Sequence, residues 1–413
     1  MSLKISRNLA VLVFSMCLFA CGKSETPAPA QQSAAATPAA QGVAALPAAM
    51  PAAQGIAPPG AATPVEATPV EATEKVLNIY NWSDYIAADT LANFEKETGI
   101  KVRYDVFDSN EVLEAKLLAG NTGYDIVVPS ASFVARQIKA GIFQPLDKTK
   151  LPNYANLDPE LMKVLAGYDA GNQHIVPWLW GTTGIGYNVK KIKERMPDAP
   201  IGSWDLILKP EIVAKFKDCG VTMLDSPVEV VPTSLRYLGL PTGSQNVADL
   251  AKAEALMMTV RPSIKYFHSS QYINDLANGE ICLVMGWSGD VFIARDRAAE
   301  AKNGNEIAYF IPREGALMWF DTMGIPKDAK HTENAYKFLD YVMRPKVIAE
   351  VSNLVKYPNG NAASTQYVEE AVRNDPAIYP DAATKANLFP NVVNTPEYDR
   401  LATRAWTRIK TNQ

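Results

Sequence analysis

The chain has 413 residues and a formal net charge of −4, with 40 basic residues against 44 acidic ones. A protein that binds nucleic acid or an anionic membrane surface needs a basic excess, which this chain lacks. The composition therefore excludes a polyanion, and nucleic acid in particular, as the main partner.

Residues 1–21 predict an export signal, in which Lys4 and Arg7 precede an apolar stretch that ends at Ala20. The sequence Leu-Phe-Ala-Cys at positions 18–21 resembles a bacterial lipobox, in which the chain is cut before the cysteine and the cysteine is lipidated. We therefore expect a lipoprotein signal peptide with Cys21 as the lipidation site. The alternative is an ordinary secretory signal peptide with an incidental cysteine, and both interpretations export the protein.

Residues 22–75 are rich in Ala, Pro, Gln and Gly and include the near-repeat TPVEATPVEAT. Such a segment has too few large apolar side chains to offset the entropy of an ordered chain. We expect a disordered or polyproline II-like tether between a lipid anchor and a folded part.

The folded part begins with strands that alternate with helices. The patterns are a strand over 76–80, a helix over 88–99 that stops at Gly99, a strand over 100–107, a helix over 108–120, a strand over 124–129 and a helix from about Ser132. Asp108 and Glu111 have the spacing of a capping box at the start of the second helix.

The middle of the chain repeats this alternation. The patterns are a strand over 219–224, a helix over 230–239, a strand over 264–267, a helix over 270–279, a strand over 281–285 and a helix from about Val291. Alternating strands and helices predict parallel α/β sheets, whose ligands bind outside the carboxyl ends of the strands.

About 340 residues follow the tether, more than one hydrophobic core usually supports, so we expect two lobes. Strands over 174–188 and 308–312 are predicted to cross between the lobes and to leave a hinged cleft. Two independent tandem domains are the alternative, but no polar linker separates the halves.

Cys219 and Cys282 each lie next to a predicted strand, and the chain is bound for an oxidising compartment. We predict that they form a disulfide. Two buried free thiols are the alternative.

Candidate site residues follow the predicted strands. Three tryptophans stand two or three residues before an aspartate, in the motifs WSD (82–84), WSGD (287–290) and WFD (319–321). A strand-end Trp can be core packing, and an Asp there can be a helix N-cap, as Asp290 could be. The recurrence at three separate places favours a site, because capping requires no nearby Trp.

An aromatic and acidic cleft suits a cationic ligand. Tryptophan faces attract cations, carboxylates bind ammonium groups through charge-assisted hydrogen bonds, and flat rings pack on methylene groups. A polyamine uses all three contacts, although a sugar also stacks on Trp and hydrogen-bonds Asp.

The patterns for catalysis are weak. GWSGD at 286–290 has Asp290 where a nucleophile elbow needs its last Gly, and GTTGIGYN is not a dinucleotide fingerprint. The three histidines show no metal-ligand spacing. We expect no enzyme activity, no metal and no cofactor.

Several motifs carry a family resemblance from about Val76 to the C-terminus, among them NWSDYIAADTLANFEKETGIKV, YDVFDSNEVLEAKLLAG, TTGIGYNV, YFHSSQYINDLANGEIC, GWSGDV and RAWTRIK. Together they resemble the periplasmic spermidine/putrescine solute-binding proteins of bacterial polyamine ABC importers, and among these the putrescine binders. The resemblance implies the type II, two-lobed periplasmic binding protein fold, an ABC transporter permease as partner, a monomer, and support for the disulfide. The lipobox and the tether fall outside it, since the family is usually soluble in the periplasm.

The resemblance also implies boundaries and a site. Lobe 1 would comprise 76–179 and 313–378, and lobe 2 would comprise 180–312 and 379–413. The expected ligand-binding residues are Trp82, Ser83, Asp84, Tyr85, Ser130, Glu229, Ser269, Trp287, Asp290, Trp319, Asp321 and Tyr357.

Departures from the family bear on the ligand. Where the putrescine binder has Phe, this chain has Trp319, as spermidine-binding relatives do. Asn391 is polar where the putrescine binder has Leu, and Ser226 replaces a small Ala. Ser132 is the same residue as in the putrescine binder. We favour putrescine, with spermidine close behind. A polyamine sensor that signals to a membrane receptor, or a binder of another cationic amine, stays open.

Overall fold

The computed structural model describes residues 75–413. The predicted signal peptide, its Cys21 and the tether up to residue 74 lie outside the described residues.

The strands are β1 (Val76–Trp82), β2 (Lys101–Phe107), β3 (Ile126–Val127), β4 (Ile175–Asn188), β5 (Val221–Met223), β6 (Ile264–Phe267), β7 (Leu283–Trp287), β8 (Ile307–Phe310), β9 (Leu317–Gly324) and β10 (Phe389–Pro390). The α-helices are α1 (Ala88–Thr98), α2 (Asn110–Ala119), α3 (Ala131–Lys139), α4 (Pro159–Leu165), α5 (Val189–Arg195), α6 (Asp205–Leu208), α7 (Pro210–Val213), α8 (Pro227–Tyr237), α9 (Val247–Val260), α10 (Tyr272–Asn278), α11 (Ser288–Ala301), α12 (Thr332–Val342), α13 (Pro345–Val355), α14 (Glu370–Arg373), α15 (Ala382–Ala386) and α16 (Pro396–Thr411). Short 3₁₀ turns are η1 (Lys148–Lys150), η2 (Pro152–Asn156), η3 (Ala214–Cys219), η4 (Arg261–Ser263) and η5 (Ala362–Tyr367).

The strands form one sheet with the order β2-β1-β3-β9-β4-β7-β5-β6, while β10 pairs with β9 and β8 with β4. Two groups of strands are parallel inside this sheet: β1 pairs with β2 and β3, and β5 pairs with β6 and β7. Between the groups, β4 and β9 pair antiparallel to each other, β9 pairs antiparallel to β3, and β4 pairs antiparallel to β7 and β8. Strand β10 pairs parallel to β9. The prediction of parallel α/β units is confirmed for both groups.

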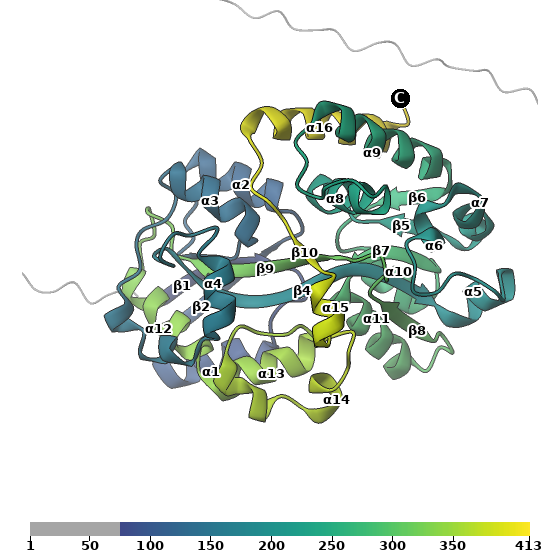
Figure 1. The fold of residues 1–413 in the computed structure, drawn as a ribbon. Coiled ribbons are helices and arrows are strands. Elements are labelled where there is room, and N and C mark those ends of the chain that lie inside the picture. Colours follow the sequence, from purple (N-terminus) through teal and green to yellow (C-terminus); the bar gives the residue numbers. More distant parts are fainter. Residues whose placement is uncertain (1–74) are drawn as a thin grey trace, which may run out of the picture. The chain divides into compact units, whose positions relative to one another are not determined.

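The two central strands connect the groups (Figure 1). The first half of β4 pairs with β9, and its second half pairs with β7 and β8. The prediction that residues 308–312 form the second strand crossing between the lobes is wrong, because β8 pairs only with β4. The second connecting strand is β9, which pairs with both β3 and β4. The reason is that β8 is an edge strand folded back on β4, whereas β9 carries the longer buried run.

Separate clusters of buried side chains pack on the two parallel groups. One contains Leu77, Ile79, Ile126, Trp178 and Phe338 from β1, β3, β4 and α12. The other contains Trp204, Phe216, Met223, Leu283 and Trp406 from the region of β5 and β7 and from α16. Each group of strands therefore has its own core.

Helix ends follow local chemistry. Helix α1 ends at Gly99, whose φ of 68° is the left-handed conformation that glycine adopts without strain, as the sequence predicts. The predicted capping box of α2 is wrong, because Ser109 caps this helix by accepting a hydrogen bond from the Val112 N–H. Asp108 and Glu111 are therefore not used as the caps of α2.

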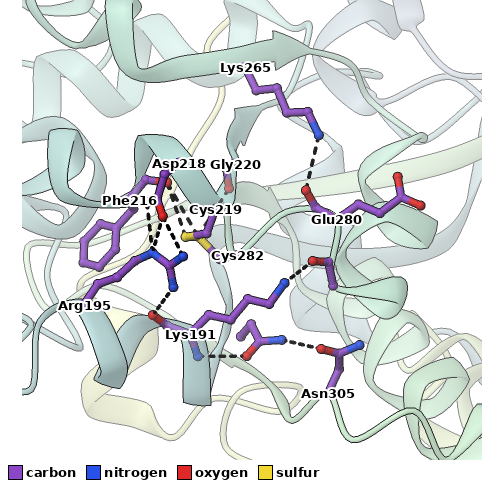
Figure 2. The surroundings of a disulfide bond; sticks show 12 residues. Lys191, Arg195, Phe216, Asp218, Cys219, Gly220, Lys265, Glu280, Cys282 and Asn305 are labelled. Atoms are coloured by element: carbon purple, nitrogen blue, oxygen red, sulfur yellow. Dashed lines mark hydrogen bonds and ion pairs between the residues drawn. A yellow bond between two sulfur atoms is a disulfide. The ribbon is translucent and has the colours of Figure 1, made fainter. Parts of the chain in front are cut away.

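A disulfide joins Cys219, at the end of η3, to Cys282, directly before β7, as the sequence predicts (Figure 2). Side chains around it tie neighbouring segments together. The Arg195 guanidinium pairs with Asp218 at 2.7 Å, and Lys265 Nζ donates to the Glu280 carbonyl at 3.2 Å. The start of β7 is thus fixed both covalently and by hydrogen bonds.

Candidate functional site

A cavity opens where the carboxyl ends of β1, β3, β5 and β7 meet β9. It encloses about 610 Å³ not filled by protein atoms, part of which is open to solvent. Its wall residues are Trp82, Ser83, Tyr85, Phe107, Asp108, Ser109, Asn110, Glu111, Ser130, Asp225, Ser226, Glu229, Ser269, Ser270, Ile273, Trp287, Asp290, Trp319, Asp321 and Tyr357. The cavity lies where the rule for ligands of parallel sheets predicts it.

The structure brings all the sequence-predicted site residues except Asp84 to this wall. Their role in binding a ligand stays a prediction. Asp84 has a φ of 54°, and its carboxylate accepts a hydrogen bond from Arg297 of α11 at 2.5 Å. It lies beside the cavity rather than in its wall.

Aromatic rings form a continuous series along the cavity. The ring centroids of Trp82 and Trp287 lie 5.5 Å apart, those of Trp287 and Trp319 6.3 Å, and those of Trp319 and Tyr357 5.3 Å. All three contacts are edge-to-face, the arrangement that aromatic quadrupoles favour. The Trp82 indole is fixed by donating from Nε1 to the Val128 carbonyl at 2.9 Å. The series presents ring faces and edges to whatever enters.

Asp290 lies in the first turn of α11, and two tyrosines hold its carboxylate. The Tyr357 hydroxyl donates to Oδ1 at 2.7 Å, and the Tyr272 hydroxyl donates to Oδ2 at 2.8 Å. Asp290 is 6% exposed and does not cap α11, whose N-cap is Trp287. Asp290 is therefore not the helix N-cap that its position in the sequence allowed.

Asp321, on β9, accepts a hydrogen bond from the Ser130 hydroxyl at 2.5 Å. Asn110 of α2 orients Ser130 in turn, because its amide donates to Ser130 Oγ at 2.9 Å and its oxygen accepts from the Ser130 N–H at 3.0 Å. This network joins β9, the start of α3 and the start of α2.

Glu229 lies in the first turn of α8. The Thr183 hydroxyl of β4 donates to its Oε2, and the Trp287 indole donates to its Oε1 at 3.4 Å. Asp290, Asp321 and Glu229 thus converge on one aromatic cavity from α11, β9 and α8.

Burial raises the pKa of each of these three carboxyls to about 7, although the hydrogen bonds from Tyr, Ser, Thr and Trp act in the opposite direction. Within residues 75–413, none of the three has a Lys or Arg nitrogen at ion-pair distance. A carboxylate without a counterion in a buried site is costly, so the cavity is suited to a guest that brings positive charge.

Sequence reasoning missed several wall residues. It assigned Asp108 and Glu111 to a helix cap. It also passed over Asp225, which stands two residues after the end of β5, where the rule for parallel sheets expects ligand contacts. Applying that rule would have identified Asp225, whereas no sequence pattern marks Phe107, Ser270 or Ile273 as wall residues. Trp204, at the start of α6, is fully buried outside this cavity.

No group of His, Cys, Asp and Glu within residues 75–413 could hold a metal ion. In the same residues, no helix is both long and apolar enough to cross a membrane.

Comparison with known proteins decides the family. Residues 89–380 match the bacterial extracellular solute-binding protein family. The chain belongs to this family. The family is described as one of extracellular solute-binding proteins, and the expected lack of enzyme activity stays a prediction.

The chain is 57% identical over 342 residues to the putrescine-binding periplasmic protein of Escherichia coli, a match that covers 82% of this chain and 92% of that one. It is 54% identical over 340 residues to a putrescine-binding periplasmic protein of Pseudomonas aeruginosa, with 82% and 93% coverage.

Among solved structures, the substrate-binding protein of a spermidine/putrescine ABC transporter from Streptococcus pneumoniae is similar, with a TM-score of 0.66 and 28% identity over 82% of this chain and 99% of that one. The predicted two-lobed, type II periplasmic binding protein fold is confirmed.

Proposed function

We propose that this protein captures a polyamine in the aromatic and acidic cavity and delivers it to the permease of an ABC transporter. The observation that carries the proposal is the set of three buried carboxyls, Asp290, Asp321 and Glu229, between aromatic rings and without a basic partner in the described residues. A polyamine supplies the missing ammonium groups, and its methylene groups pack on the rings.

Putrescine is the favoured ligand, with spermidine next. The names of the relatives from Escherichia coli and Pseudomonas aeruginosa support putrescine, and that of the Streptococcus pneumoniae protein supports either amine. A sugar is disfavoured because it brings no positive charge to the three carboxyls.

The mechanism is capture and closure. Lobe 1 (76–179 and 313–378) supplies Asp321 and the Trp82 region, and lobe 2 (180–312 and 379–413) supplies Asp290 and Glu229. Ligand contacts from both lobes favour a closed form, which the permease recognises. The ligand is released unchanged, without catalysis.

The protein acts in the periplasm as a monomer, held to a membrane by a lipid on Cys21. The support is the lipobox-like sequence at positions 18–21 and the periplasmic location named for the relatives. Labelling cells with a radioactive fatty acid tests the anchor, because Cys21→Ser should abolish incorporation.

The decisive test is isothermal titration calorimetry of residues 22–413 with putrescine, spermidine, cadaverine and glucose. We expect saturable one-to-one binding of putrescine, weaker binding of spermidine and no heat with glucose. Silence with both polyamines would overturn the proposal. Mass spectrometry of the ligand recovered after denaturation should return the same mass, and a new product would indicate an enzyme instead.

A further inference from the structure

An outer pocket adjoins the ligand cavity, and the two share Asp108, Ser109, Glu111, Asp225 and Ser269 as wall residues. The far wall of the outer pocket is the C-terminal helix α16, which contributes Trp406 and Lys410. A ligand that extends beyond Glu229 at the start of α8 therefore meets this helix.

Of the three acidic residues shared by the two pockets, Asp225 pairs with a lysine of α16. Lys410 Nζ contacts both carboxylate oxygens of Asp225 at 2.9 Å, and the Trp406 indole donates to Oδ1 at 2.7 Å. The Asp225 N–H donates to Ser269 Oγ at 3.2 Å, which fixes this residue at the cavity edge. Lys410 and Asp225 are 37% and 38% exposed, so the pair can exchange with solvent and with a competing cation.

The arrangement repeats the chemistry of the inner cavity with one difference. Glu229 has an indole donor, Trp287, and no basic partner in the described part of the chain. Asp225, four positions earlier, has an indole donor, Trp406, and the ammonium of Lys410. The protein's own ammonium thus occupies the outer of two similar carboxylate positions.

We propose that Lys410 is a specificity-determining residue that keeps the pocket selective for a short diamine. An additional ammonium on a longer polyamine would extend toward Asp225 and would there meet the Lys410 ammonium, which repels it and already holds the carboxylate. A diamine that ends at the inner carboxyls does not reach this position. The inference rests on the proposed function and names the residue that sets the length of its ligand.

The hydrogen bonds from Lys410 and Trp406 to Asp225 also hold α16 against the loop before α8, which is a structural role. A purely structural role would change stability, and would change the affinities for all ligands together. The ratio of the spermidine and putrescine affinities separates the two roles, because an anchor has no reason to alter it.

The test is titration calorimetry of the mature chain and its Lys410→Met variant with putrescine and spermidine. Removing the ammonium while keeping the side-chain length should strengthen spermidine binding relative to putrescine by about tenfold, with putrescine affinity unchanged within about twofold. The matched control, Lys410→Arg, keeps the charge and should retain the original ratio. An unchanged ratio in Lys410→Met, or an equal loss for both amines, overturns the proposal.

A second variant tests the partner. In the Lys410→Met background, Asp225→Asn should remove the gain for spermidine, because the uncovered carboxylate is the group that binds the additional ammonium. A gain that persists would overturn the assignment to Asp225. If Lys410→Met does not fold, Lys410→Gln provides the same comparison. Failure of the unaltered chain to bind putrescine would contradict the proposed function itself, an outcome distinct from an unchanged ratio.

Discussion

The carboxylate of Asp290 shows how a single residue can be prepared for a cation. Burial raises the pKa of the Tyr272 and Tyr357 phenols well above the usual value, so both hydroxyls stay protonated and donate to Asp290. The two donors orient the carboxyl group but bring no positive charge to it. The ligand ammonium therefore meets an acceptor whose position is already set.

Replacing Asp290 with Ala should abolish tight polyamine binding while the protein stays folded. Removing the carboxylate leaves an ammonium partly unpaired in a buried site, which costs about 2–5 kcal/mol, or roughly thirty- to several-thousand-fold in affinity. Titration calorimetry measures the loss, and circular dichroism checks the fold. The control is Asp218→Asn, which removes a charge from an exposed residue paired with Arg195 outside the cavity. Unaltered affinity in Asp290→Ala would show that the site is assigned incorrectly.

Polyamine affinity should rise with pH between about 5.5 and 7.5. Burial raises the pKa values of Glu229, Asp290 and Asp321 to about 7, so the empty cavity holds protons below that pH. Amine groups with pKa values near that of lysine stay charged throughout, so binding has to release the carboxyl protons. Calorimetry in two buffers with different ionisation enthalpies counts these protons. Equal affinity at both ends of the range, with no proton release, would contradict the expectation.

The stability of the ligand-free protein should depend on pH in the opposite sense. An acid whose pKa is raised by folding binds protons more tightly in the folded state, so these three groups destabilise the fold increasingly as the pH rises from about 4 to about 7. The matched comparison is the same denaturant titration with Asp290→Asn, in which the slope of unfolding free energy against pH should become shallower. An identical slope in both proteins would count against the raised pKa of Asp290.

At the scale of elements, removing the disulfide tests how much it stabilises the parallel group formed by β5, β6 and β7. Cys219 and Cys282 are 63 residues apart, and closing a loop of that length removes roughly 4 kcal/mol of unfolded-chain entropy. The double variant Cys219→Ala/Cys282→Ala should lower the free energy of unfolding by about this amount in denaturant titrations. Putrescine affinity should stay unchanged, because neither cysteine lines the cavity. An unaltered midpoint would mean that the bond does not stabilise the fold.

The elements could be predicted from the sequence where a local signal determined them. Periodicity located β1, α1, β2 and α2, and Gly99 marked the end of α1. The sequence assigned the cap of α2 to Asp108, but the structure uses Ser109; Asp and Ser are both common N-caps, so local sequence does not separate adjacent candidates. The assignment of the second crossing strand to β8 was wrong because strand pairing between distant segments leaves no trace in local alternation.

The wall of the cavity was predictable to a similar extent. Trp–Asp motifs identified Trp82, Asp290 and Asp321 as residues of the cavity wall. Trp82 ends β1 and Asp290 follows β7, whereas Asp321 lies within β9. The turn of Asp84 toward Arg297 was not predictable, because it depends on a contact between residues 213 positions apart. The pairing of Asp225 with Lys410 is hidden from the sequence for the same reason.

At the scale of the whole molecule, ion pairs join the proposed lobes. Arg136 of α3 pairs with Asp399 of α16 at 2.9 Å and with Glu114 of α2 at 2.6 Å, while Asp84 pairs with Arg297. The contact between Arg136 and Asp399 exists only while α3 and α16 are close together. In the proposed closure, this contact would favour the closed form over the open one.

Arg136→Ala should weaken putrescine binding by up to about fivefold, since a partly exposed ion pair contributes up to about 1 kcal/mol. The loss should shrink at high salt, which screens such pairs. Small-angle scattering of the ligand-free variant should give a larger radius of gyration than the unaltered protein. The matched control is Arg195→Ala, whose partner Asp218 lies in the same proposed lobe. Equal effects of the two variants would show that the Arg136 pair does not act on closure.

The tryptophan series along the cavity also makes the protein its own optical reporter. Trp82, Trp287 and Trp319, three of the seven tryptophans, line the cavity, whereas Trp178 and Trp204 are fully buried elsewhere. An ammonium that binds against these indoles and displaces water changes the environment of their emission, while the buried Trp178 and Trp204 contribute a constant background. Occupancy can therefore be followed by intrinsic fluorescence, without a label, in the same cuvette in which ligands of different length compete.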